Sequence, residues 1–216
     1  MSDKVYRSKG TKDMDKLKNI AIFASGNGSN FQAIVDAVKK KKLKVNIKLL
    51  ICDNPQAYVL QRAVKAKVKA FIADRRDFLS KKSFEEEVIR KLRLEKIDLI
   101  VLAGFMRILS ASFVRWYKNK ILNIHPSLLP AFKGRHAIKD AFLYGVKITG
   151  VTVHFVDEET DHGPILLQEA MKVKENDTLK SLEARIHSVE HTLYPEVIRL
   201  ILKRRLRIKR RKVEVG

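Results

Sequence analysis

Residues 98–103 read DLIVLA, an almost uninterrupted apolar run that predicts a strand buried on both faces. Such strands occupy central positions in parallel sheets, where helices cover both sides. Similar strand-like segments at 19–25, 45–52, 69–73 and 120–125 alternate with helix-like segments at 30–41, at 83–96 and after the turn at 53–55. This alternation predicts an α/β protein with a Rossmann-like, open, mostly parallel sheet flanked by helices.

The C-terminal half continues with a short helix around 113–117 and two longer strands at 147–156 and 165–173. A closing helix is expected over 178–203, where Pro195 predicts a kink or a break. Ser83, three residues before Glu86, matches a capping box at the start of the helix at 83–96. We expect one domain over 19–203, a basic N-terminal extension over 1–18, and a segment at 204–216 that is either a basic C-terminal extension or an added edge strand.

The formal net charge of +21 favours another class of protein, because a strongly basic surface attracts nucleic acid. Much of this charge lies at the ends: residues 1–19 hold six Lys or Arg against three Asp, and residues 203–216 hold eight against one Glu. Few aromatic residues lie among the basic ones, a pattern typical of solvated surfaces, which argues against nucleic acid as a partner.

Cys52 is the single cysteine, so no disulfide can form within the chain, and a cytoplasmic location is expected. The sequence has no apolar stretch long enough to cross a bilayer, which argues against a membrane partner. A monomer and a homodimer both remain open.

The segment at 122–130, LNIHPSLLP, places an amide and an imidazole two residues apart at the end of an apolar run. In a strand, alternation sends Asn123 and His125 to the same face, and Pro126 ends the strand. An amide donor beside a group that gives or takes a proton suits acyl transfer. The structural alternative is a strand-end histidine bonded to a backbone carbonyl.

Residues 25–30, SGNGSN, form a glycine-bearing turn between the first strand and the first helix. Backbone N–H groups at a helix N-terminus can receive a phosphate there, although a plain turn with an Asn cap explains the same residues. The segment is neither a Walker sequence nor a complete dinucleotide fingerprint.

Taken together, residues 24–30, 102–109, 122–130 and 150–168 resemble the folate-dependent, single-domain phosphoribosylglycinamide formyltransferases over roughly 19–203. The resemblance implies the formyltransferase fold and small-molecule partners. It also implies transfer of a formyl group from the co-substrate 10-formyltetrahydrofolate to the amine of 5′-phosphoribosylglycinamide in de novo purine biosynthesis. The attack would be direct, through a tetrahedral intermediate, and no metal would be needed.

Three sets of site residues follow from the resemblance. The catalytic set is Asn123, His125 and Asp161; the substrate-binding set is Gly28, Ser29, Asn30, Gly104, Pro126 and Glu190; and the folate-binding set is Lys81, Met106, Arg107, Ile108, Leu109 and Asn123. Asn123 and a protonated His125 would stabilise the oxyanion, and Asp161 would keep His125 charged and help to move the proton. Lys81 could equally be a solvated lysine, and Glu190 an ordinary carboxylate on a helix surface.

His187 and His191 have the spacing of a zinc-binding pair, but no third ligand is suggested. His154 and His162 are expected to be structural, and so is His136, although its loop could cover the substrate and touch its phosphate. The chain has Asp161-His162-Gly163 where relatives often carry two glycines.

Three other functions stay in view. Methionyl-tRNA formyltransferase shares the fold and donor and would use the basic charge to bind RNA, but a second domain would be expected after Lys203. Formyltetrahydrofolate hydrolase would carry an N-terminal regulatory domain, and only eighteen residues precede the first expected strand. A non-catalytic RNA-binding module would leave Asn123, His125 and Asp161 without a purpose.

Overall fold

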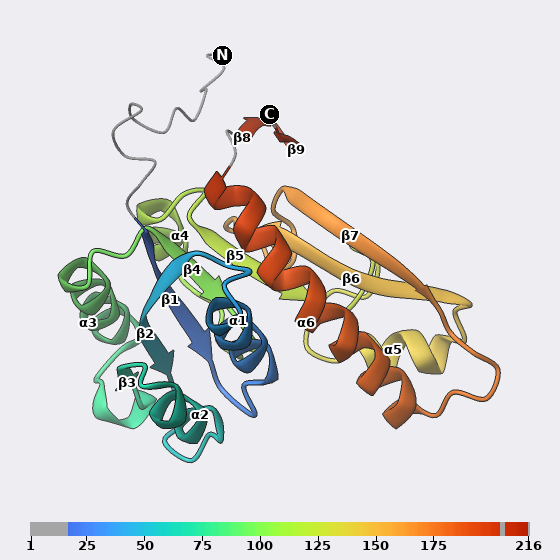
Figure 1. Ribbon diagram of the computed structural model, residues 1–216, viewed down its shortest axis with the longest axis horizontal. Coiled ribbons are helices and arrows are strands. Elements are labelled where there is room, and N and C mark those ends of the chain that lie inside the picture. The colour runs from blue at the N-terminus through green and yellow to red at the C-terminus, as the bar shows by residue number, and fades with distance from the viewer. Residues whose placement is uncertain (1–16, 204–205, 216) are drawn as a thin grey trace.

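Residues 17–203 and 206–215 are described by the computed structural model, in which seven strands form the main sheet (Figure 1). The strand order is β3-β2-β1-β4-β5-β6-β7. The bounds are β1 Lys18–Ala24, β2 Val45–Cys52, β3 Ala70–Ile72, β4 Leu99–Leu102, β5 Ile121–His125, β6 Ile148–Phe155 and β7 Ile165–Lys172. The pairs from β3 to β5 are parallel, and the β5–β6 and β6–β7 pairs are antiparallel. The predicted α/β architecture is confirmed.

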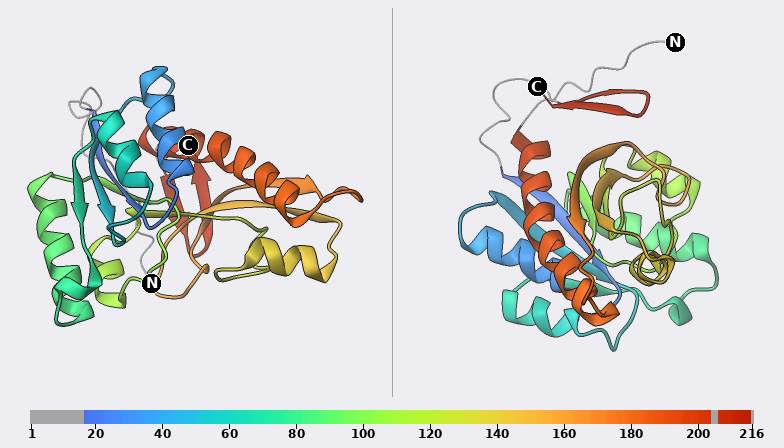
Figure 2. Two further views of the ribbon diagram at one scale, coloured as in Figure 1. Left: turned by 90° about the horizontal axis from the view of Figure 1, so that it is seen from below. Right: turned by 90° about the vertical axis from the view of Figure 1, so that its right-hand side faces the viewer.

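Alternate residues of β1 enter two apolar clusters, one on each face of the sheet. Ile20 and Ile22 belong to the cluster that includes α1 (Ser29–Lys39), α2 (Val59–Ala66) and α6 (Leu179–Lys203). Ala21 and Phe23 belong to the cluster that includes α3 (Lys81–Leu94) and α4 (Ala111–Trp116). Figure 2 shows α1 and α6 on one side of the sheet and α3 and α4 on the other. Burial on both faces explains why β1 and β4 are almost entirely apolar.

The strand order reverses at β1, because the chain first builds outward to β3 and then returns to place β4 and β5 on the other side. Loops that follow neighbouring strands on either side of such a reversal leave in opposite directions, which opens a crevice at the carboxyl ends of the strands. Residues 25–28 follow β1, and residues 103–110 follow β4. The crevice is therefore bordered by the segments that the sequence singles out.

Tyr194 connects α6 to the two strands β4 and β5. Its fully buried hydroxyl lies 2.8 Å from the carbonyl oxygen of Leu102 in β4 and 3.2 Å from that of Leu122 in β5. Burial raises the pKa of the Tyr194 hydroxyl, so it remains a proton donor to these carbonyls. The closing helix is thus held in register with the two strands.

One local prediction is wrong, and the structure bears on two positions where alternatives were open. Ser80 rather than Ser83 caps α3: the Ser80 Oγ accepts a hydrogen bond from the Ser83 N–H at 3.0 Å, and the Ser83 Oγ accepts one from the Ser80 N–H at 3.1 Å. Pro195 does not break the closing helix, since α6 is one helix of 25 residues around it, and a kink there stays a prediction. Of the two alternatives for the C-terminal segment, an added edge strand is not what the structure shows: β8 (Leu206–Lys209) and β9 (Lys212–Val215) form a hairpin of their own outside the main sheet.

Two elements were not foreseen. The helix α5 (Ala137–Tyr144) follows the loop after Pro130, and a short 3-10 helix, η2, spans Arg75–Asp77. Cys52 is buried, and burial raises the pKa of its thiol, consistent with a cysteine of the core. In the part of the chain that the structure describes, none of the helices has the length and apolar character needed to cross a membrane.

Candidate active site

A cavity of about 700 Å³ opens at the carboxyl ends of β1, β4 and β5. Its volume is in the range of small-molecule sites, ~300–1,000 Å³. The cavity is lined by every predicted site residue except one: Gly28, Ser29, Asn30, Gly104, Met106, Arg107, Ile108, Leu109, Asn123, His125, Pro126, Asp161 and Glu190. The fold therefore brings together residues that lie far apart in the sequence.

Lys81 is the predicted residue that the structure does not bring to this cavity. It is the first residue of α3 and is exposed. Phe84, Glu85 and Val88 form the buried side of α3, so the first turn presents Lys81 to solvent. Its exposed position agrees with the alternative expectation that Lys81 is a solvated lysine.

Asp161 bridges the other two predicted catalytic residues. Its Oδ2 lies 3.4 Å from Nδ1 of His125, and its Oδ1 accepts a hydrogen bond from Nδ2 of Asn123 at 3.3 Å. Asn123 and His125 project from the same face of β5, as strand alternation predicts. The His125 side chain is 5% exposed and that of Asp161 is 10% exposed, so their electrostatic interaction is only weakly screened by water.

The second ring nitrogen of His125 is also occupied. Its Nε2 lies 2.8 Å from the carbonyl oxygen of Phe132, and because a carbonyl can only accept, Nε2 carries a proton. His125 thus lies between the carboxylate of Asp161 and the carbonyl of Phe132. The loop that contains Phe132 also donates the Gly134 N–H to Oδ2 of Asp161 at 2.8 Å.

The loop that carries Asp161 has a constrained backbone. Asp161 adopts a left-handed conformation with a φ of 48°, which is uncommon for residues other than glycine. A Cβ at Gly163 would lie only 1.8 Å from the carbonyl oxygen of Phe155, so only glycine fits where the loop crosses the end of β6. Backbone strain of this kind persists where surrounding contacts hold it, and it often marks a functional site.

The turn after β1 presents free backbone donors to one end of the cavity. Gly28 is the N-cap of α1, with a φ of 75° and no side-chain cap, so the first N–H groups of the helix have no intrahelical partner. A Cβ at Gly28 would lie 2.4 Å from Cγ2 of Val59. Both the left-handed backbone and the close approach of α2 thus require glycine, and the arrangement suits an anion.

Glu190 lies at the same end of the cavity and is buried, which excludes the alternative of a surface carboxylate. Its Oε2 accepts hydrogen bonds from Nδ2 of Asn30 and Nδ1 of His187, each at 2.9 Å. The contact with Glu190 raises the pKa of His187. The Oδ1 of Asn30 is buried and has no hydrogen-bond partner among the described residues, so one acceptor beside Glu190 is free.

The loop after β4 forms the other end of the cavity. The side chains of Met106 and Ile108 are 50% and 64% exposed, so apolar surface is offered to a ligand. The Met106 N–H donates to Oγ of Ser25 at 2.9 Å, and the Met106 carbonyl accepts from Nη2 of Arg135 at 2.8 Å. Nη1 of Arg107 lies 3.7 Å from Oδ2 of Asp53. Polar contacts therefore hold the loop while its apolar side chains remain uncovered.

The sequence profile of the formyl transferase family matches residues 18–198. The chain belongs to the formyl transferase family. It is 47% identical over 186 residues to the phosphoribosylglycinamide formyltransferase of Bacillus subtilis, covering 86% of this chain and 95% of that one. Glycinamide ribonucleotide transformylase 1 from Symbiobacterium toebii has a TM-score of 0.89 at 41% identity, covering 92% of this chain and 94% of that one. The corresponding protein from Geobacillus kaustophilus has a TM-score of 0.84 at 49% identity, covering 87% and 100%.

The cavity of this formyl transferase is also lined by His154, which was expected to be structural and was not among the predicted site residues. Its Nδ1 donates to the Phe155 carbonyl at 2.8 Å, so its Nε2 is free to accept from Nδ2 of Asn123 at 3.2 Å. Burial lowers the pKa of His154, which keeps the ring neutral and able to accept. The only signal for this contact is the register of β5 and β6, in which Asn123 and His154 are paired.

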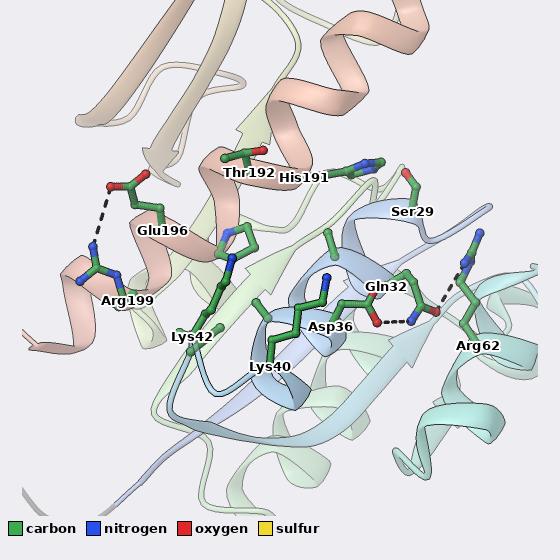
Figure 3. Close-up of a pocket in the computed structure, with 14 residues that line it drawn as sticks. Ser29, Gln32, Asp36, Lys40, Lys42, Arg62, His191, Thr192, Glu196 and Arg199 are labelled. Atoms are coloured by element: carbon green, nitrogen blue, oxygen red, sulfur yellow. Dashed lines mark hydrogen bonds and ion pairs between the residues drawn. The ribbon is translucent and has the colours of Figure 1, made fainter.

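A second cavity of this formyl transferase, about 630 Å³ in volume, lies between α1 and α6 (Figure 3). It shares Ser29 with the first cavity, but none of the predicted catalytic residues line it. His191 borders this second cavity, whereas His187 borders the first, and the two rings stack with their centroids 6.5 Å apart. Because the predicted catalytic residues line the first cavity and not the second, the first cavity is the candidate active site.

Among the described residues, no group of three or more His, Cys, Asp or Glu could hold a metal ion.

Proposed function

We propose that residues 19–203 transfer the formyl group of 10-formyltetrahydrofolate to the amine of 5′-phosphoribosylglycinamide. The products would be formylglycinamide ribonucleotide and tetrahydrofolate. The observation that carries the proposal is the contact of Asp161 with both Asn123 and His125 inside a cavity with an anion-binding turn at one end and apolar side chains at the other. The similarity to the Bacillus subtilis enzyme supports the same activity.

The two ends of the cavity suit the two substrates. The N-terminus of α1 at Gly28 would receive the ribose phosphate, because its N–H groups are free and the helix dipole favours an anion there. Glu190 and the free Oδ1 of Asn30 would accept hydrogen bonds from hydroxyl or amine groups of the same substrate. Met106 and Ile108 would cover one face of the pterin ring.

In the reaction, the amine nitrogen attacks the formyl carbon and forms a C–N bond, which leaves a tetrahedral intermediate with a negatively charged oxygen. Asn123 and the imidazolium of His125 would donate hydrogen bonds to that oxygen. Asp161 would stabilise the imidazolium. Collapse of the intermediate breaks the bond to N10 of the folate, and the proton lost by the amine ends on N10, carried by Asp161 directly or through water.

Both donors of the site are occupied before the formyl oxygen arrives. Nδ2 of Asn123 contacts His154 and Asp161, and Nε2 of His125 donates to the Phe132 carbonyl. The formyl oxygen must therefore replace Phe132, Asp161 or His154 as acceptor, and movement of the loop at 131–134 would release His125. A reducing cytosol is the compartment that suits the free thiol of Cys52.

The test is an acceptor comparison with 10-formyl-5,8-dideazafolate as donor, followed by the absorbance of the deformylated product. Rapid release with glycinamide ribonucleotide, and none with methionyl-tRNA or without an acceptor, is the expected result. Release that requires methionyl-tRNA would assign the chain to tRNA formylation, and equal release without any acceptor would assign it to hydrolysis. Either result would refute the proposal.

A further inference from the structure

The C-terminal hairpin of β8 and β9 contacts the loop that carries Asp161. Arg211, in the turn of the hairpin, donates from Nη2 to the carbonyl oxygen of His162, and its Nη1 lies 2.7 Å from Nε2 of the His162 ring. His162 directly follows Asp161 in the chain. We propose that Arg211 is a positioning residue that holds the Asp161 loop in its catalytic conformation; this inference rests on the function proposed above.

Both ring nitrogens of His162 have polar neighbours. Nδ1 lies 2.8 Å from Oδ2 of Asp157 and 3.1 Å from Nη1 of Arg211, whereas Nε2 lies 2.7 Å from the same Nη1. Because a carboxylate only accepts, Nδ1 donates to Asp157, and Nε2, the nearer of the two nitrogens, is the acceptor for the Arg211 guanidinium. One arginine therefore fixes both the backbone and the ring of His162 through two nitrogens, a geometry that a lysine cannot reproduce.

The Asp161 loop needs such a contact because its backbone is strained. The left-handed conformation of Asp161 is held on the C-terminal side by Gly163, which fits against the carbonyl of Phe155. Arg211 bonds to the residue between these two. The contact thus acts at the point where a small rotation of the backbone would move the Asp161 carboxylate away from His125 and Asn123.

The hairpin that presents Arg211 is anchored to the body of the protein. Leu206 is 8% exposed and belongs to the same apolar cluster as α1 and α6, and Ile208 and Val213 pack against that cluster. The contacts between β9 and β7 place the hairpin beside the strand that follows the Asp161 loop. An anchored hairpin can hold a guanidinium in place, whereas a free terminus would not.

Arg211 is exposed, so its hydrogen bonds contribute little to global stability. The proposal therefore predicts a loss of turnover without a comparable loss of folding. This distinguishes positioning from a merely structural role, because a structural contact would lower the melting temperature and leave the turnover of the folded enzyme unchanged.

The experiment compares Arg211→Ala and Arg211→Lys with the matched control Arg207→Ala. Arg207 lies on the same hairpin and is also exposed, but its side chain makes no hydrogen bond or ion pair with another described residue. Steady-state kinetics give kcat and KM for glycinamide ribonucleotide. Hydrogen–deuterium exchange of the peptide covering residues 157–164 reports on the loop independently of activity, and thermal unfolding checks the fold.

For Arg211→Ala we expect kcat to fall about tenfold with little change in KM, because the loop is displaced while the substrate contacts remain. Exchange of the loop should be faster by on the order of tenfold. Arg211→Lys should recover part of kcat, and Arg207→Ala should match the wild type. Equal kcat for the two alanine variants, with or without faster exchange, would overturn the proposal. If the wild type did not use glycinamide ribonucleotide, the proposed function would fail, and kcat could not test the role of Arg211. In that case hydrogen–deuterium exchange still tests it, because an unchanged exchange rate of residues 157–164 in Arg211→Ala would show that Arg211 does not hold the Asp161 loop.

Discussion

Replacing Asp161 by Asn removes one negative charge from the centre of the site with almost no change in shape. Asn tolerates the left-handed backbone conformation that Asp161 adopts, so the loop is not forced to move. The amide cannot satisfy all the neighbours of the carboxylate, because Gly134 and Asn123 both donate to it. Either orientation of the new amide places its NH₂ group against a donor, the Gly134 N–H in one case and Nδ2 of Asn123 in the other. The substitution therefore tests the charge and acceptor capacity of Asp161.

The magnitude follows from the distance of 3.4 Å between Asp161 Oδ2 and His125 Nδ1. With an effective dielectric constant of ~20, two unit charges at this separation interact by about 5 kcal/mol, which is an upper limit. When the charge of Asp161 is removed, water and nearby dipoles compensate for part of the lost interaction. If half of the interaction stabilises the transition state and is lost in the variant, the loss is about 2.5 kcal/mol. We therefore expect kcat to fall on the order of a hundredfold.

The assay is the dideazafolate absorbance measurement at saturating substrates, with Asp140→Asn as the matched control. Asp140 lies in the first turn of α5, is exposed, and has no hydrogen bond or ion pair from its side chain to another described residue. Circular dichroism and thermal unfolding establish that both variants are folded. If Asp161→Asn retained kcat within about threefold of the wild type, the carboxylate would not support the charged histidine and the reasoning would be refuted.

Three further predictions concern the surroundings of the site. Gly28→Ala should raise KM for the ribonucleotide and lower the free energy of unfolding by about 1 kcal/mol or more, because the new Cβ meets Val59. Adding Val59→Ala should recover part of both losses, and a double variant no better than the single one would contradict this. Tyr194→Phe should cost about 1–2 kcal/mol in urea unfolding because two buried carbonyls lose their donor, and an unchanged midpoint would contradict it. Burial lowers the pKa of His154 in the folded protein below 6.5, so the unfolded chain takes up a proton at a higher pH than the folded protein does. The contribution of the neutral His154 to stability is therefore complete above pH 6.5 and is lost as the pH falls from 6.5 toward the folded-state pKa. Urea titrations of His154→Gln should show a shallower loss below pH 6.5, and equal slopes for the variant and the wild type would refute this.

Local patterns in the sequence predicted most of the sheet. The strand at 98–103 could be recognised because burial on both faces leaves no polar alternation, and β4 occupies a central position next to β1. The start of α3 was misplaced because Ser80 and Ser83 are both good caps, and only the hydrogen bonds between them identify which one acts. Pro195 does not end α6, since the packing of a long amphipathic helix tolerates one missing backbone donor.

The sequence by itself determined that Asn123 and His125 share a face, because strand alternation is a property of the backbone over three residues. It also located a turn suited to an anion at Gly28, since the glycine and the helix start are adjacent in the chain. Only the tertiary structure decided that Lys81 lies outside the cavity, that His154 is paired with Asn123, and that Arg211 reaches the loop of Asp161. Asn123 and His154 are 31 positions apart in the sequence, and His162 and Arg211 are 49 positions apart. Strand pairing and the packing of the hairpin bring these residues together, and the periodicity of a short segment carries no information on either.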